Sequence, residues 1–203
     1  MTGLKGTSHK RGECDILQLN DEAAGNEFFG KERKMGRYSK EYNKELCSRY
    51  PFLIPRNSFN GRKITEGAGY WPGSLDKIPE YDWEFTELDA MPDGWRKAFG
   101  EQLCEELKAA LVESGQLEEY RILQIKEKYG TLRWYSYFPN EKVREVIYKY
   151  EKLSARTCIC RGKPATVVTT GWISPYCDDC VPKCDGETVP VDEYYEDEGD
   201  DDE

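Results

Sequence analysis

Apolar residues recur at helical spacing in three segments of the chain. Tyr42, Leu46 and Tyr50 lie between Ser39, a good helix-capping residue, and Pro51, so they predict a helix between these two residues. Asp93 is expected to cap a longer helix that runs to about Ser114. The apolar face of that helix has one residue in every four, at Trp95, Phe99, Leu103, Leu107 and Leu111. Asn140 is expected to cap a third helix, whose apolar stripe consists of Val143, Val146, Ile147, Tyr150 and Leu153.

Three other segments have residue patterns that are typical of strands. Residues 81–88 predict a half-buried strand, because Tyr81, Trp83 and Phe85 alternate with polar residues. Residues 120–128 and 131–138 flank Tyr129-Gly130 and predict a β-hairpin, with Gly130 in the left-handed turn position. The segment 51–79 is rich in Pro and Gly, so we expect it to be mostly irregular.

The order of these elements predicts an α+β domain in which helices pack on a small antiparallel sheet. We expect this domain to span residues 35–156 and a small zinc-ribbon-like module to follow at residues 157–184. Residues 1–34 lack sustained apolar periodicity and are interpreted as a flexible extension. If the codons of Lys31 and Glu32 form a ribosome-binding site, translation starts at Met35, which is the alternative to a start at Met1.

The negative charge of the chain is concentrated at its C-terminus. The net charge is −10, and residues 185–203 hold eleven acidic residues and no Lys or Arg, which leaves 29 basic and 28 acidic residues in the rest. An almost neutral body disfavours strong nonspecific DNA binding, which needs clustered cations. We interpret residues 185–203 as a solvated, disordered acidic tail, with mimicry of nucleic-acid charge toward a basic partner as the alternative.

The sequence excludes several classes of enzyme. Its one histidine, His9, lies in the N-terminal extension, so the predicted domain lacks the imidazole of Ser-His-Asp hydrolases, HExxH proteases and histidine-metal nucleases. The glycine-rich residues 67–73 match neither the GxGxxG motif nor the GxxxxGK(S/T) motif of nucleotide-binding loops. We therefore infer no small-molecule substrate. Asp93 followed by Gln124-Ile125-Lys126 resembles the PD-(D/E)xK nuclease signature, with a glutamine replacing one Mg²⁺-binding carboxylate. A metal-dependent nuclease is therefore an alternative to a non-enzymatic protein.

Five of the eight cysteines lie between residues 158 and 184. The sequence has neither an apolar run of 18 residues nor a secretory signal, so we expect a cytoplasmic protein without a membrane segment. In a reducing compartment, clustered thiols bind metal more often than they form disulfides. Sixteen residues, which can form a hairpin at 165–170 and 171–176, separate two cysteine pairs at zinc-ribbon spacing. The predicted ligands of a structural zinc are Cys158, Cys160, Cys177 and Cys180, with Cys184 as an alternative ligand; reduced cysteines without metal are the other interpretation.

Four segments resemble a family of uncharacterised bacteriophage and prophage proteins: residues 50–57 (YPFLIPRN), 88–100 (LDAMPDGWRKAFG), 124–135 (QIKEKYGTLRWY) and 171–177 (GWISPYC). The resemblance covers roughly residues 35–180 and excludes both ends of the chain. Members of this family carry a CxxCG motif at the first cysteine pair. In this chain, Arg161 occupies the position of the second cysteine, and Cys160 lies one place earlier. The resemblance implies a phage setting but no particular reaction.

These observations predict a non-enzymatic phage or prophage accessory protein with a structural zinc site that binds a host or phage protein. An inhibitor of host defence is a specific form of this class. The alternative is a nucleic-acid-binding zinc-ribbon protein, in which cations contact phosphates and aromatic rings stack on bases. The residues for that alternative are Lys126, Lys128, Arg133, Trp134, Tyr135, Lys163 and Trp172, which in the simplest interpretation form a solvated hairpin face.

Overall fold

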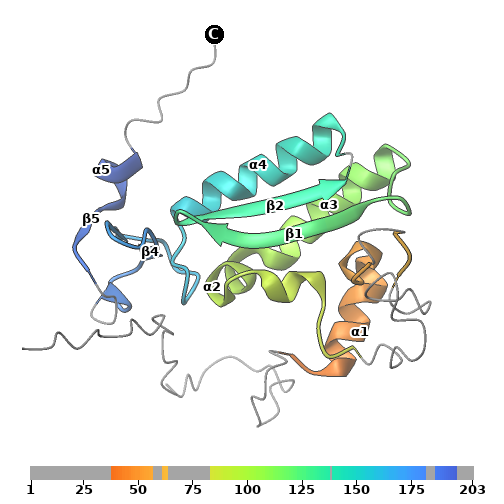
Figure 1. The fold of residues 1–203 in the computed structure, drawn as a ribbon, viewed down its shortest axis with the longest axis horizontal. Helices are drawn as coiled ribbons and strands as arrows, with labels where there is room; N and C mark the ends of the chain where they lie inside the picture. The colour runs from red at the N-terminus through yellow and green to blue at the C-terminus, as the bar shows by residue number, and fades with distance from the viewer. Residues whose placement is uncertain (1–37, 57–60, 64–82, 138, 182–185, 196–203) are drawn as a thin grey trace, which may run out of the picture.

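The chain has the predicted α+β fold (Figure 1). The structure, a computed structural model, describes residues 38–56, 61–63, 83–137, 139–181 and 186–195. Predictions for residues 1–37, including the N-terminal extension and Met35, fall outside this part. The helical elements are α1 (Lys40–Arg49), η1 (Pro51–Leu53), η3 (Glu87–Ala90), α2 (Asp93–Trp95), the π-helical η4 (Arg96–Gly100), α3 (Glu101–Glu113), α4 (Glu141–Ala155) and α5 (Val191–Tyr195). The strands are β1 (Arg121–Lys128), β2 (Thr131–Tyr137), β3 (Val167–Thr169), β4 (Pro175–Tyr176) and β5 (Thr188–Pro190).

Helix α1 begins and ends where the sequence predicts. The Tyr42 amide donates a hydrogen bond to the Ser39 hydroxyl at 3.2 Å, and Pro51 starts a separate 3-10 turn. Leu46 and Cys47 on this helix are buried in the main core. The serine cap and the proline stop therefore define this helix as expected.

The longest helical segment runs from Asp93 to Glu113 through α2, η4 and α3, close to the predicted extent. All five predicted apolar residues of this segment are buried, including Trp95 and Leu103 at 0% exposure. Asp93 is the first helical residue and Pro92 occupies the cap position, so the predicted Asp93 cap is wrong by one residue. Pro92 can precede the helix because its fixed φ and missing amide cost nothing at this position.

The predicted strand at residues 81–88 is wrong for the described residues 83–88. Trp83 has a φ of +65°, and a 3-10 turn, η3, begins at Glu87. The Asp89 carboxylate accepts hydrogen bonds from the Thr86 amide at 2.6 Å and the Thr86 hydroxyl at 3.0 Å. These local hydrogen bonds form a capping box, and they compete with the inter-strand hydrogen bonds that a strand would need.

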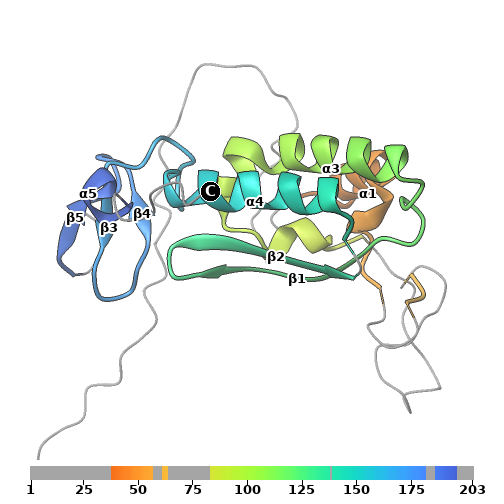
Figure 2. The ribbon, with the colours of Figure 1, turned by 90° about the horizontal axis from the view of Figure 1, so that it is seen from above.

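The predicted hairpin is confirmed as β1 and β2, which pair Ile125 with Trp134. Tyr129 and Gly130 both have positive φ values, of 54° and 73°, as a two-residue hairpin turn requires. Helices α3 and α4 cover one face of the hairpin (Figure 2). On the open edge of β2, the Leu132 amide donates to the Ser154 hydroxyl at 2.7 Å, so α4 also protects that edge.

Helix α4 begins after Asn140, whose side chain accepts a hydrogen bond from the Val143 amide at 2.9 Å, as predicted. Val143, Ile147 and Tyr150 are buried. The predicted stripe is wrong at its end, because Leu153 is 42% exposed and Ser154 is buried. Ser154 faces inward because its hydroxyl binds the edge of β2. None of the helices in the described ranges is long and apolar enough to cross a membrane.

A second, three-stranded sheet with the order β4-β3-β5 lies beyond the turn of the hairpin (Figures 1 and 2). The predicted hairpin of the module is confirmed, since β3 pairs Val167 with Tyr176 of β4. The module extends further than predicted, because β5 pairs with β3 and α5 follows it. Residues 188–195, assigned to the acidic tail, are therefore ordered, and their apolar Val191 is buried. The rest of that tail lies outside the described residues.

Candidate metal centre

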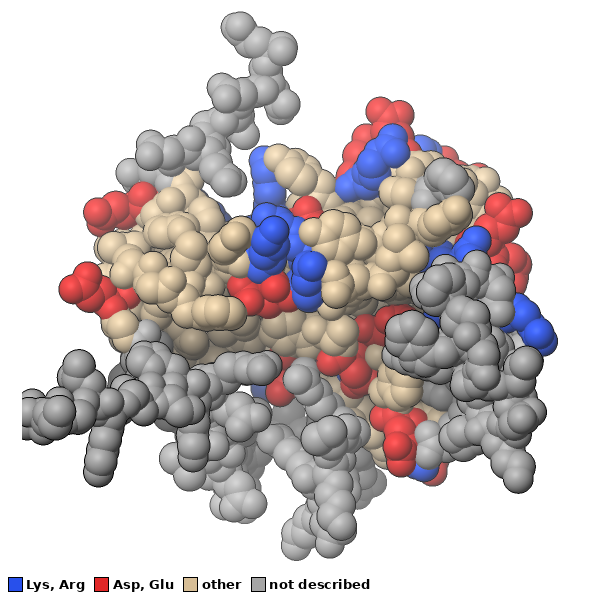
Figure 3. Space-filling model, in the orientation of Figure 1, with Lys and Arg blue, Asp and Glu red and all other residues tan. Residues whose placement is uncertain are grey.

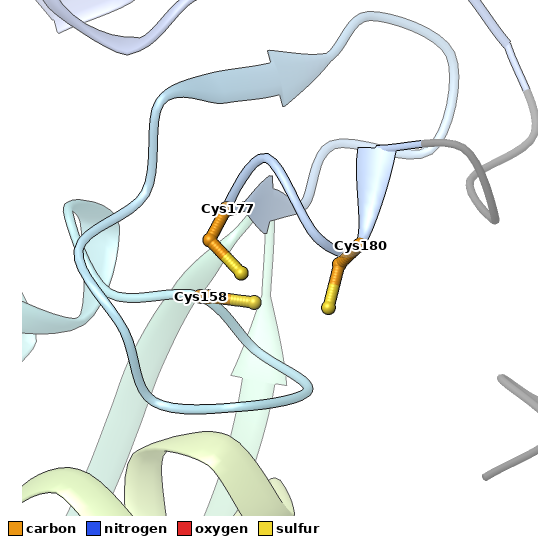
Figure 4. Close-up of side chains that lie close together, drawn as sticks. All are labelled: Cys158, Cys177 and Cys180. Atoms are coloured by element: carbon orange, nitrogen blue, oxygen red, sulfur yellow. The ribbon is translucent and has the colours of Figure 1, made fainter. Parts of the chain in front are cut away.

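Three cysteines from both ends of the predicted ribbon meet in space. The sulfur atoms of Cys158, Cys177 and Cys180 all lie within 4.8 Å of one another (Figure 4). All three residues are buried, with exposures of 0%, 4% and 3%. This cluster is the one group of three or more potential ligands at this spacing among the described residues, and it is close enough to hold a metal ion.

The first cysteine turn is built by a short bridge between Thr157 and Pro164. Within it, the Cys158 amide donates to the Lys163 carbonyl at 2.8 Å, and the Gly162 amide donates to the Cys158 carbonyl at 2.9 Å. Gly162 has a φ of +75°, a conformation that favours glycine. Gly162 therefore allows the backbone to turn back toward Cys158, and Arg161 stands at the position before this glycine.

The second cysteine turn follows β4 directly. The Cys180 amide donates to the Cys177 carbonyl at 2.8 Å, which closes a tight turn and brings the two sulfurs together. The Ile159 amide donates to the Pro175 carbonyl at 3.0 Å, so the backbone also joins the two turns. Together the two turns bring three of the four predicted sulfur ligands close to one another.

The electrostatics of the cluster suit a cation. A hydrogen bond from Cys160 and backbone amides lower the pKa of Cys158 to about 4. Burial raises the pKa of Cys177, and burial with the nearby Cys158 charge raises that of Cys180 to about 12. Two further negative charges are unfavourable beside Cys158 unless a cation neutralises them. A bound divalent ion would displace the remaining protons and hold all three sulfurs as thiolates.

The fourth ligand is less defined than the first three. Cys160 is half-buried and packs against the cluster, but its sulfur is not in the group within 4.8 Å. Cys184, the alternative ligand, lies outside the described residues. The Arg161 side chain is 3.3 Å from the Asp179 carboxylate, which Lys163 also contacts at 2.7 Å. Arg161, which stands where the resemblance places the second cysteine, is therefore part of a salt-bridge network with Asp179 and Lys163.

The first cysteine turn is anchored to the main core by two residues that the sequence did not single out for this role. The Gly94 amide donates to the Ile159 carbonyl at 2.9 Å. The Trp95 indole donates to the Thr157 carbonyl at 2.8 Å, and Trp95 is completely buried. The sequence contains a signal for this contact, a glycine in the first turn of a helix, where glycine is otherwise unfavourable.

The proposed nucleic-acid residues lie in three different environments. Lys126, Lys128, Arg133 and Tyr135 occupy the face of the hairpin opposite its buried residues. Trp134 is buried, and its indole donates to the Tyr120 hydroxyl at 3.0 Å. Lys163 belongs to the salt-bridge network, and Trp172 is 80% exposed between β3 and β4. Burial therefore removes Trp134 from any exposed nucleic-acid surface, and the prediction for this residue is wrong.

The nuclease pattern finds little geometric support in the described residues. Asp93 opens α2 in the helical layer, whereas Gln124 and Lys126 lie on the hairpin face opposite the buried Ile125. A pocket between the end of α3 and the start of α4 is lined by Glu113, Ser114, Asn140, Glu141 and Lys142, and contains none of the three residues of this pattern.

Comparison of the chain with protein-family models, with curated proteins and with solved structures finds no match in any of the three.

Proposed function

We propose that this chain is a non-enzymatic phage or prophage accessory protein that binds a host or phage protein through a zinc-stabilised module. Three thiolates favour zinc among the common divalent ions, and structural zinc sites hold four ligands in a tetrahedron. In this proposal Cys160 moves in to supply the fourth sulfur. The phage setting in this proposal comes from the resemblance of four sequence segments.

The size of the module supports a structural role for the metal. Among its described residues, the apolar core of the module has three buried residues, Ala165, Val168 and Val191, with Ile173 and Tyr195 packed against them. A core of this size stabilises a fold too little to hold three short strands together without a disulfide, a metal or a neighbouring domain. The buried sulfurs provide a site for a metal. The contacts to Gly94 and Trp95 attach the module to the neighbouring domain. A metal buried in this way is placed to hold the chain rather than to reach a substrate.

The observation that carries the binding role is the exposure of Trp172. Its side chain is 80% exposed, in the loop between β3 and β4. The loop has a defined shape, because the Ser174 amide donates to the Thr169 hydroxyl at 3.0 Å. Exposed tryptophans on ordered loops often anchor protein interfaces, since burial of the indole gives a large gain in free energy. We infer that the metal holds this loop in place through Cys177, which directly follows β4.

Trp172→Ala tests this proposal. Tagged wild-type and variant proteins would capture partners from host lysate, with and without infecting phage, with quantification by mass spectrometry. Tyr148→Ala, which removes an exposed aromatic ring from α4, is the matched control. We expect one partner to remain with wild type and control and to fall at least about tenfold with Trp172→Ala, a typical interface-anchor effect. The zinc content and melting temperature of Trp172→Ala should not change.

Retention of the same partner by Trp172→Ala would contradict the proposed surface. Cys177→Ser should lose zinc, melt at a lower temperature and lose the partner. If this variant keeps its fold and its partner without zinc, the structural role of the metal is wrong.

A further inference from the structure

A row of cationic and tyrosine side chains lies on the outer face of the β1–β2 hairpin, away from α3 and α4. Ile125 and Trp134 are paired and buried, so the residues next to them along each strand point outward. Figure 3, which looks onto this side of the molecule, shows Lys and Arg side chains gathered toward the turn end of the hairpin, with acidic groups beside them. The outward cationic and tyrosine residues are Arg121, Lys126, Lys128, Arg133, Tyr135 and Tyr137.

The cations and the rings form pairs. The Arg121 guanidinium lies 4.6 Å from the centre of the Tyr137 ring, and the Lys126 ammonium lies 5.2 Å from that of Tyr135. At the turn, the Lys128 ammonium lies 5.1 Å from the Tyr129 ring. The three rings are 43% to 66% exposed. Each ring thus has a cation over it and keeps part of its surface accessible.

The outward positions of the two strands carry no carboxylate. Glu127 shares the inner side with its partner Leu132, and its carboxylate accepts a hydrogen bond from the Gly130 amide at 2.7 Å. Among the outward cations, and within the described residues, Arg133 forms a salt bridge, with its guanidinium 3.8 Å from the Glu151 carboxylate. The face therefore has a local excess of positive charge that the almost neutral body does not have.

We propose that this face binds single-stranded nucleic acid, which goes beyond the protein partner proposed above. Bases stack on the tyrosines, and the phosphate of each stacked nucleotide lies near the paired cation. The pairs at residues 121, 126 and 128 extend over about 23 Å of strand, which is enough for several nucleotides. Stacking on aromatic rings within a cationic surface is the usual way to bind single strands without sequence preference. An acidic protein would use the cations but not the ring faces.

The test is fluorescence anisotropy of a labelled thymidine oligonucleotide of about 12 nucleotides, with the full-length protein between about 50 and 200 mM salt. Lys126→Ala with Lys128→Ala should reduce the slope of log affinity against log salt by about 1.4, since each phosphate contact on a single strand contributes about 0.7. Tyr135→Ala with Tyr137→Ala should weaken binding at least about fivefold at every salt concentration without changing this slope. The control, Lys44→Ala with Lys97→Ala, removes two exposed lysines from helical segments and should change neither quantity.

Every variant is checked by its melting temperature. If the tyrosine variant unfolds, Lys126→Glu with Lys128→Glu tests the same face, and it should abolish binding. The proposal is overturned if wild type shows no salt-dependent binding, or if the control loses as much affinity as the hairpin variants. Equal affinity for a polyglutamate peptide and the oligonucleotide would assign the face to an acidic protein and would also overturn it.

Discussion

Gly94, in the first turn of α2, and Gly162, in the first cysteine turn, lie so close together that neither position has room for a side chain. A Cβ on Gly94 would lie 2.3 Å from the Cys158 carbonyl oxygen, and a Cβ on Gly162 would lie 2.4 Å from the Gly94 carbonyl oxygen. Both contacts are with backbone, which cannot move aside as a flexible side chain does. The candidate metal centre and the core helix are therefore one interlocked unit.

Gly94→Ala should weaken the contact between α2 and the first cysteine turn. Because the added methyl group overlaps the backbone at Cys158, we expect the free energy of unfolding to fall by about 3 kcal/mol and zinc retention to decrease. Urea denaturation and elemental analysis measure these two quantities. Gly171→Ala is the control, since nothing lies within 4 Å of its Cβ. Equal stability of the two variants would show that the close contact is not important.

Gly162→Ala and Gly115→Ala form a second matched pair. Both glycines have a positive φ, of 75° and 68°, but Gly115 has open space around its Cβ. Gly115→Ala should therefore cost about 1 kcal/mol for the left-handed backbone alone. Gly162→Ala should cost more and should release zinc, because it adds a backbone clash. Thermal unfolding of both zinc-loaded variants checks this, and identical costs would rule out the clash.

Stability should depend on pH through Glu87. Burial raises the pKa of Glu87 from 4.5 to about 7. The folded state therefore binds the proton more tightly than the unfolded state, and this stabilising contribution is lost as the pH rises from 4.5 through about 7. Glu87→Gln stays neutral, so it should be more stable than wild type by up to about 3 kcal/mol near pH 8.

The same difference should be much smaller near pH 5, where wild type keeps the Glu87 proton. Urea denaturation at the two pH values measures it. Glu45→Gln, on the exposed side of α1, is the control and should show no such change. A Glu87→Gln variant with the pH dependence of wild type would be inconsistent with burial of this carboxyl group.

The acidic C-terminus should compete with nucleic acid for the hairpin face. Tyr195, the last described residue, lies near the hairpin turn, since a Cβ on Gly130 would be 3.4 Å from its hydroxyl. Seven of the eight residues that follow are acidic. Eight residues reach up to about 26 Å, about the length of β1. Changing these seven acids to amides should therefore strengthen oligonucleotide binding several-fold at low salt.

Fluorescence anisotropy measures this gain. In the Lys126→Ala, Lys128→Ala background the gain should become smaller, because the tail has lost its basic site. An unchanged or weaker affinity after neutralisation of the tail would contradict the competition.

Local signals in the sequence predicted most of the secondary structure. Ser39 and Asn140 cap their helices as expected, because each places a side-chain acceptor before an amphipathic segment. Gly130 predicted the hairpin turn, because glycine adopts a positive φ without steric cost, whereas the positive φ of Tyr129 was not predictable from its side chain. Spacing alone also predicted that Cys158, Cys177 and Cys180 come together.

Features that depend on contacts between distant residues were not predictable from local pattern. The alternation at residues 81–88 was misleading, because the Thr86 and Asp89 side chains satisfy the local backbone in a turn. Val191 sits among acidic residues, so composition concealed the strand and helix at residues 188–195. Trp134 was assigned to a binding surface, yet its burial depends on the register of the hairpin.

The zinc content of the purified protein tests the central claim most directly. After zinc-supplemented expression, elemental analysis should give close to one zinc ion per chain. Serine substitution of Cys158, Cys177 or Cys180 should each reduce this value strongly, and Cys160→Ser should weaken retention more than Cys184→Ser. Full-length protein with far less than one zinc ion per chain, or with the same zinc content after Cys177→Ser, would contradict the account.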